Sequence, residues 1–132
     1  MPLFASGAGV TRAGEREQAL VNGTDLYATI AELAGASVTL PADSQSFAGT
    51  LLAANASPRT FNYSEIEGSG DSGWTTRDAT HKLIVYSDGS EELYDHDNDP
   101  NEWHNLAHDP SLNGIKDEHA EWIDRLTNNQ DE

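Results

Sequence analysis

Residues 82–106 read KLIVYSDGSEELYDHDNDPNEWHNL, and the second half of the chain is organised around them. Strand-forming residues at 82–86 and 92–94 flank Asp88 and Gly89, and glycine adopts the positive φ of a tight turn at little steric cost. A turn of this composition between two strands is typical of a β-hairpin. We therefore predict that these two segments pair as an antiparallel hairpin.

An acidic turn follows the hairpin. Pro100 donates no backbone hydrogen bond and disfavours helical geometry in the residue before it, so the second strand must end ahead of it. We expect Trp103 and Leu106, in the short segment that comes next, to pack back under the sheet.

The carboxylates of this turn begin like a calcium-binding EF-hand loop, at Asp95, Asp97 and Asp99. Pro100 occupies the sixth position, which requires glycine, and Leu106 occupies the twelfth, which requires glutamate. We interpret the segment as a solvated turn.

Two histidines beyond the turn have the four-residue spacing of zinc ligands on a helix. The glutamate that follows the first histidine of such a motif is missing, and Pro110 limits any helix through them. We therefore expect His104 and His108 to be surface residues.

Two further strands are predicted, and they precede the hairpin. Residues 61–66 alternate apolar and polar with a period of two, which favours a half-buried strand. Residues 74–78 form the other strand, and the first hairpin strand extends back to residue 81. Four consecutive strands with short connections are expected to pair antiparallel.

The last predicted element is an amphipathic helix over residues 115–127. Its apolar face consists of Ile115, Trp122, Ile123 and Leu126, with His119 near it. One apolar sheet face and one such helix form a two-layer unit. We predict an α+β fold in which a small antiparallel sheet of about four strands packs on the C-terminal helix.

The first half of the chain contains one clear helix, at residues 24–34. Thr24 is the expected N-cap, and Gly35 lies where a left-handed C-cap is expected. One apolar stripe runs along this helix, at Leu26, Ile30, Leu33 and Ala34. Before it we predict a short strand in the apolar start, 1–9, and a strand or turn at 15–21.

Composition excludes several kinds of function. The 132 residues include no cysteine, so disulfides, thiolate zinc sites and a cysteine nucleophile are excluded. The net charge of −16, from 23 acidic and 7 basic residues, repels nucleic acid and anionic membranes. No apolar run is long enough to cross a bilayer, so we expect a soluble protein. The charge indicates that it has neither nucleic acid nor a membrane as a partner. A solvated acidic surface explains this charge better than a calcium-binding tail or a saline habitat.

Two motifs resemble conserved segments of the sulfatase family. The combination of Gly89, ELYD at 92–95, Asp-Pro at 99–100, Glu102 and NLA at 105–107 resembles the motif that closes sulfatase sequences. The segment around DLYATI, residues 25–30, with LAG at 33–35, resembles a helix of the same family. The chain is similar to the C-terminal portion of an arylsulfatase-like enzyme of the alkaline-phosphatase superfamily.

The resemblance implies a division of the chain. Residues 1–35 would form an edge strand and a helix of a large catalytic α/β domain that this chain lacks, 36–60 a connection, and 61–132 the C-terminal subdomain. The helix at 24–34 would pack on the missing domain, so we expect it to be less protected than the hairpin.

The resemblance also implies that the parent enzyme hydrolyses sulfate esters of a small molecule or glycan, using formylglycine and calcium. Neither the Cys/Ser-x-Pro-x-Arg motif that yields formylglycine nor the family's metal ligands are present here, so this chain alone is expected to be inactive and without a cofactor of its own. The parent is expected to be periplasmic or secreted.

Four residues are candidates for substrate binding: Trp74, Arg77, His81 and Lys82. Arginine forms bidentate contacts with sulfate-like oxyanions, and tryptophan offers a platform for sugar or aryl rings. The alternative is that Trp74 belongs to the core and that Arg77 pairs with a carboxylate.

Two other functions remain open. The chain could be a free-standing acidic module that binds a carbohydrate or a protein. It could also be the tail of a related phosphonate or phosphodiester hydrolase.

Overall fold

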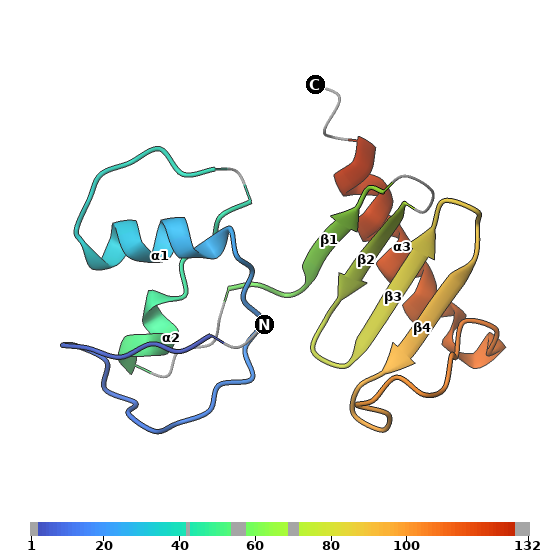
Figure 1. Ribbon diagram of the computed structural model, residues 1–132, viewed down its shortest axis with the longest axis horizontal. Coiled ribbons are helices and arrows are strands. Elements are labelled where there is room, and N and C mark those ends of the chain that lie inside the picture. The colour runs from blue at the N-terminus through green and yellow to red at the C-terminus, as the bar shows by residue number, and fades with distance from the viewer. Residues whose placement is uncertain (1–2, 42, 54–57, 69–71, 129–132) are drawn as a thin grey trace. The chain divides into compact units, whose positions relative to one another are not determined.

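The computed structural model describes residues 3–41, 43–53, 58–68 and 72–128 (Figure 1). The chain forms two compact units, which we call the N-terminal unit, residues 1–60, and the C-terminal unit, residues 61–132. In the described parts of the chain, no helix has the length and apolar character needed to span a membrane.

The C-terminal unit contains the predicted sheet (Figure 1). Its strands are β1 (Asn62–Ile66), β2 (Gly73–Arg77), β3 (His81–Tyr86) and β4 (Glu91–Asp95). They pair in sequence order, and every neighbouring pair is antiparallel. The four predicted strands are thus confirmed, with ends that differ by at most one residue.

The hairpin between β3 and β4 has the predicted turn. Gly89 has a φ of 84°, and the backbone N–H of Tyr86 donates to the Ser90 carbonyl at 2.9 Å. The Asp88 carboxylate accepts a hydrogen bond from the Ser90 N–H at 2.8 Å, which stabilises the turn.

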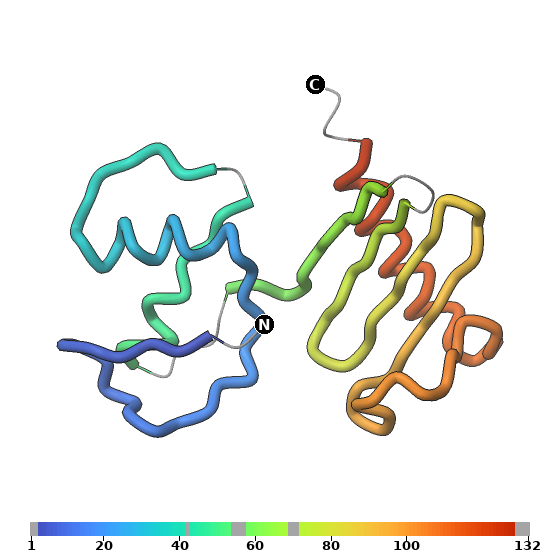
Figure 2. Tube along the Cα trace, viewed as in Figure 1, coloured from blue at the N-terminus to red at the C-terminus, as the bar shows by residue number. Residues whose placement is uncertain are grey.

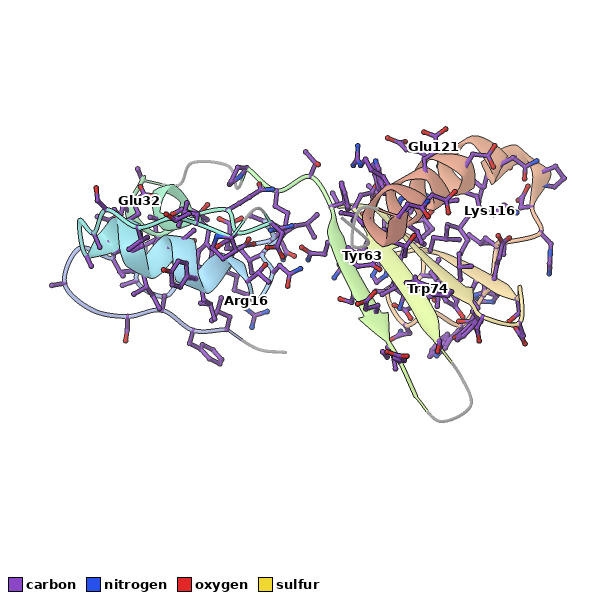
Figure 3. The ribbon with its side chains drawn as sticks, turned by 90° about the horizontal axis from the view of Figure 1, so that it is seen from above. Arg16, Glu32, Tyr63, Trp74, Lys116 and Glu121 are labelled. Carbon is purple, nitrogen blue, oxygen red and sulfur yellow. The ribbon has the colours of Figure 1, made fainter. Side chains whose placement is uncertain are left out.

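A long helix, α3 (Asn113–Asn128), lies along one face of the sheet, and Glu121 projects from it away from the strands (Figure 3). A short 3₁₀ turn, η1 (Pro110–Leu112), precedes it. The core between helix and sheet consists of Leu83, Leu93, Ala107 and Ile123. The α+β prediction is confirmed, whereas Leu126 is only half-buried and lies outside this core.

The segment after β4 makes a compact loop before it reaches α3 (Figure 2). Leu106 packs against the core as predicted, and its N–H donates to the Leu93 carbonyl at 2.8 Å. The prediction for Trp103 is wrong, because its side chain is 77% exposed. The preceding Glu102 has a left-handed φ of 58°, and this turn in the backbone separates the two side chains.

The N-terminal unit contains α1 (Asp25–Leu33) and a short helix, α2 (Ala48–Ala53), where only a connection was predicted. Its described residues contain no strand, so the strand expected at 1–9 is not observed there, and of the strand or turn expected at 15–21 the strand is not observed. A strand needs a neighbour for its backbone hydrogen bonds, and no described segment of this unit supplies one.

The buried face of α1 is polar. Asp25, Ala28 and Thr29 are buried, whereas Leu26, Ile30 and Leu33 are exposed by 36%, 63% and 50%. Segment 44–47 lies against the buried face, because the Thr29 hydroxyl accepts from the Phe47 N–H at 3.1 Å. Among the described residues of the unit, none therefore covers the apolar stripe of this helix.

Only the N-terminal end of α1 differs from the prediction. Thr24 occupies the predicted N-cap position, but it has helical dihedral angles and its side chain forms no capping hydrogen bond. The carboxylate of Asp25 instead accepts from the Asn22 N–H at 2.7 Å. Gly35 has the predicted left-handed conformation, with a φ of 64°.

Candidate functional site

The four candidate residues lie on two different faces of the sheet. Thr76 points toward α3, because its hydroxyl oxygen lies 3.1 Å from Nδ1 of His119. Trp74 is two residues earlier on the same strand, so it shares this face, and it packs against the core. Arg77 is next to Thr76 and faces the other way, to what we call the open face. Trp74 and Arg77 therefore cannot contact one side of the same ligand.

His81 and Lys82 separate in the same manner. His81 alternates with the core residue Leu83 and lies on the α3 side, where its Nδ1 is 2.8 Å from the Thr80 hydroxyl. Lys82 lies on the open face, directly across the strand pair from Arg77. The structure thus brings Arg77 and Lys82 together on the open face, whereas Trp74 and His81 lie on the α3 side of the sheet.

Lys82 is held in place by two neighbours. Its Nζ lies 2.5 Å from Oε2 of Glu102 and 5.5 Å from the centre of the Tyr94 ring. Burial, with a hydrogen bond to Glu92, raises the pKa of Tyr94 to about 12, so its hydroxyl stays neutral and donates. The lysine charge is therefore partly neutralised, and its position is fixed.

Arg77 differs from Lys82 in its surroundings. Its side chain is exposed, and none of the described residues forms a hydrogen bond or ion pair with its guanidinium group. The expected alternative, pairing with a carboxylate, is not what the structure has. Its charge does reach His96, whose pKa is lowered first by burial and then by Arg77. An unpaired guanidinium on a chain of net charge −16 is available for an external anion.

Sequence reasoning missed the residues of the loop that borders this pair. Nε2 of His96 lies 3.2 Å from Oε1 of Glu102, whose other oxygen binds Lys82. The loop also bonds to the β2–β3 turn, since the His96 N–H donates to the Thr80 carbonyl at 2.7 Å. No local pattern predicts these contacts, because Glu102 is 20 residues from Lys82.

A second polar group lies on the α3 side of the sheet. Thr76 and His119 are both 0% exposed, and Nε2 of His119 lies 3.5 Å from Oδ2 of the half-buried Asp78. Burial lowers the pKa of His119, which favours the neutral ring. Although the order Thr–His–Asp is that of a catalytic triad, the threonine and the histidine are closed to a substrate, and the group links α3 to the sheet.

The acidic turn uses its carboxylates for backbone hydrogen bonds. Oδ1 of Asp95 accepts from the N–H groups of Asp97 and Asn98 at 2.9 and 3.1 Å. Within the described ranges, no three His, Asp or Glu side chains gather as they would around a metal ion. His104 and His108 are exposed, as predicted.

The N-terminal unit has a pocket of about 370 Å³ that no prediction anticipated. It lies between the segment 3–21 and the residues around α2. Apolar side chains such as Leu3, Val10 and Phe47 line it together with Arg12, which forms an ion pair with Glu17 at 2.5 Å.

Known proteins resemble this chain in sequence and in fold. Residues 1–129 match the family described as N-sulphoglucosamine sulphohydrolase, C-terminal. A curated relative, "Sulfatase" of Formosa agariphila, is 29% identical over 106 residues, which are 80% of this chain and 20% of the relative.

Solved structures of sulfatases have the same fold. BT1596, a 2-O GAG sulfatase, is 30% identical with a TM-score of 0.72, over 82% of this chain and 25% of that one. BT4656, solved in complex with its substrate D-glucosamine-2-N,6-O-disulfate, shares the fold at 22% identity and a TM-score of 0.66, over 79% of this chain and 23% of that one.

This chain thus spans about a quarter or less of the length of these relatives. The match to the family covers nearly all of it, and the sheet with its covering helix is common to the solved structures. The chain belongs to the N-sulphoglucosamine sulphohydrolase C-terminal family and is the C-terminal portion of a sulfatase.

Proposed function

We propose that the parent of this chain hydrolyses sulfate esters and that the C-terminal unit contributes to substrate binding. The observation that carries this proposal is the exposed guanidinium group of Arg77 beside Lys82, which has no ion pair in the described parts of a chain that belongs to a sulfatase family. A sulfate ester carries a negative charge, and arginine binds such oxyanions through two parallel N–H···O bonds.

The chemical step requires groups that this chain lacks. It has no cysteine and no Ser-x-Pro-x-Arg motif for a formylglycine nucleophile, and its described residues gather no metal ligands. We propose that formylglycine and calcium belong to the N-terminal catalytic domain of the parent. The isolated chain would then bind without hydrolysing.

The proposed substrate is a sulfated sugar. BT1596 acts on a 2-O sulfated GAG, and BT4656 binds a disulfated glucosamine, so two relatives of the same fold act on anionic sugars. An anionic ligand is repelled by most of this acidic surface and attracted at Arg77. Because such glycans are met outside the cytoplasm, we propose that the parent is periplasmic or secreted.

The N-terminal unit is proposed to dock on the rest of the enzyme. Leu26, Ile30 and Leu33 expose one apolar stripe of α1, and Phe4 is 91% exposed. Apolar side chains gathered in this way mark an interface, and about three quarters of the relatives' length lies outside this chain. We therefore assign residues 1–35 to the edge of the catalytic domain, as its helix and edge segment, and 36–60 to the connection.

Steady-state kinetics of the parent enzyme test the role of Arg77. Arg77→Ala should raise KM for a sulfated disaccharide by about tenfold or more, because a charge-assisted hydrogen bond is lost. Arg77→Lys should recover part of the loss. Arg125→Ala removes the same charge from α3, behind the sheet, and should leave KM unchanged.

Three results would count against the proposal. Unchanged KM with a lower melting temperature in Arg77→Ala would make the residue structural. Hydrolysis of phosphonates or phosphodiesters, without hydrolysis of sulfate esters, would move the parent to a related class. Equal affinity of isolated residues 1–132 and of the parent for the disaccharide would favour a free-standing binding module.

Hydrogen exchange tests the docking of α1. In the isolated chain its amides should exchange faster than those of the β3–β4 hairpin, and in the parent they should become protected. Equal exchange of α1 in both proteins would contradict docking through this helix.

A further inference from the structure

Trp103 is an unexplained feature of the C-terminal unit. Its side chain is 77% exposed, although tryptophan is among the side chains that contribute most when buried. Its neighbours in the sequence, Asn101, Glu102 and His104, are all polar. A single aromatic ring amid polar groups is suited to a ligand with both apolar and polar surfaces, as a sugar ring has.

The backbone that presents Trp103 is fixed. Glu102 is the one described residue other than glycine with a left-handed φ, at 58°. Its N–H donates to the Asp99 carbonyl at 3.1 Å, and the Asp99 carboxylate accepts from the N–H groups of Trp103 and His104. Left-handed backbone in a non-glycine residue costs energy and is often retained at functional sites.

The same loop is tied to the open face. The Glu102 carboxylate bonds to Lys82 at 2.5 Å, and Lys82 is the cross-strand neighbour of Arg77. Arg77, whose guanidinium has no partner among the described residues, and Lys82 lie at one end of the sheet, and Trp103 directly follows the Glu102 that pairs with Lys82. This end offers a cation for an anionic group and an aromatic ring for the sugar that carries it.

We propose that Trp103 is a stacking platform for a sugar ring of an anionic glycan, one of whose sulfate or carboxylate groups binds Arg77. This inference rests on the proposed function, and it assigns the aromatic contact to Trp103 in place of Trp74, which packs against the core. Exposed apolar residues suited to docking lie on α1 of the N-terminal unit, so protein contacts do not require this ring.

The test uses the parent enzyme with a heparin tetrasaccharide and a small aryl sulfate. Trp103→Ala should lower the ratio of kcat/KM between the tetrasaccharide and the aryl sulfate by about 3–10-fold, the range of one aromatic contact. Trp103→Phe keeps a ring and should recover part of the ratio. Ile66→Ala removes another side chain that is 72% exposed in the same unit and should leave the ratio unchanged.

Binding is measured separately, by tryptophan fluorescence during titration with the tetrasaccharide. The fluorescence change should be present in the wild type, absent in Trp103→Phe, and absent for the wild type with a neutral dextran oligosaccharide. This titration tests the platform even if the parent hydrolyses no sulfate ester, so failure of the proposed function is recognised independently.

Two outcomes would overturn the inference. An unchanged kcat/KM ratio together with an unchanged fluorescence response in the variants would show that the ring takes no part in binding. Protection of Trp103 from acrylamide quenching in the ligand-free parent, with a lower melting temperature of Trp103→Ala, would show that the rest of the enzyme covers it.

Discussion

At the scale of single residues, the N-terminal unit is centred on the carboxylate of Asp25, which is 1% exposed. Arg59 binds both of its oxygens, one of them through Nε at 2.7 Å, and the N–H groups of Asn22 and Gln45 donate to it as well. Burial alone raises the pKa of Asp25, but these hydrogen bonds outweigh burial and lower the pKa. The ion pair joins α1 to the end of this unit, 34 residues away.

Arg59→Ala should destabilise this unit by about 3–5 kcal/mol, because it leaves a buried carboxylate without its counter-ion. The measurement is hydrogen exchange of the α1 amides, with exposed Arg16→Ala as the control. Since the folded pKa of Asp25 is depressed, the contribution of the ion pair is complete above the ordinary value of 3.8 and is lost as pH falls through the lowered pKa. Equal exchange rates in the two variants would contradict this role.

Buried His119 makes the stability of the C-terminal unit depend on pH. Its pKa is lowered by burial, with Asp78 opposing the shift, and His81 is the other titratable group that acts on it. The unfolded chain therefore binds a proton at higher pH than the folded one, and stability falls as pH drops below about 6.5. His119→Gln should reduce the fall in melting temperature between pH 7 and pH 5, while a control variant at an exposed histidine, His108→Gln, should retain the slope. If the melting temperature depends on pH equally steeply in the wild type and in His119→Gln, His119 is not the source of the pH dependence.

At the scale of elements, the C-terminal unit depends on the contact between α3 and the sheet. Ile123 is 5% exposed and touches the core, whereas Leu126, one turn later, is half-buried. Ile123→Ala should cost about 2–5 kcal/mol, and Leu126→Ala should cost less. Urea unfolding followed by the fluorescence of Trp122, whose ring stacks on Phe61 at 4.4 Å, measures both. A larger loss for Leu126→Ala would mean that the helix face is wrongly assigned.

At the scale of the whole molecule, the net charge of −16 opposes compactness. Added salt screens repulsion between exposed carboxylates, so the melting temperature of residues 1–132 should rise from low to molar sodium chloride. Sucrose, which stabilises without screening charge, separates this effect from general solute exclusion. A melting temperature that does not change with salt would show that the acidic surface carries no net repulsion.

The sequence by itself determined the order and kind of the elements in the C-terminal unit. The alternation in 61–66, the Asp88-Gly89 turn and the apolar face of 115–127 are local patterns, and local hydrogen bonding and side-chain period suffice to set a strand, a hairpin or a helix. The sulfatase motifs are also local sequence patterns, and they identified the family. The alternation also contains a signal that sequence reasoning overlooked, because Trp74 and Arg77 are three apart on one strand and must face opposite sides.

Only the tertiary structure decided which side chains meet. The polar face of α1 is buried because Asp25 pairs with Arg59, and the exposure of Trp103 follows from the backbone at Glu102. Glu102 pairs with Lys82, and Arg77 has no ion pair among the described residues. These outcomes depend on contacts between residues far apart in the chain. Their pairing is set by competition among many equivalent charges, which no local pattern resolves.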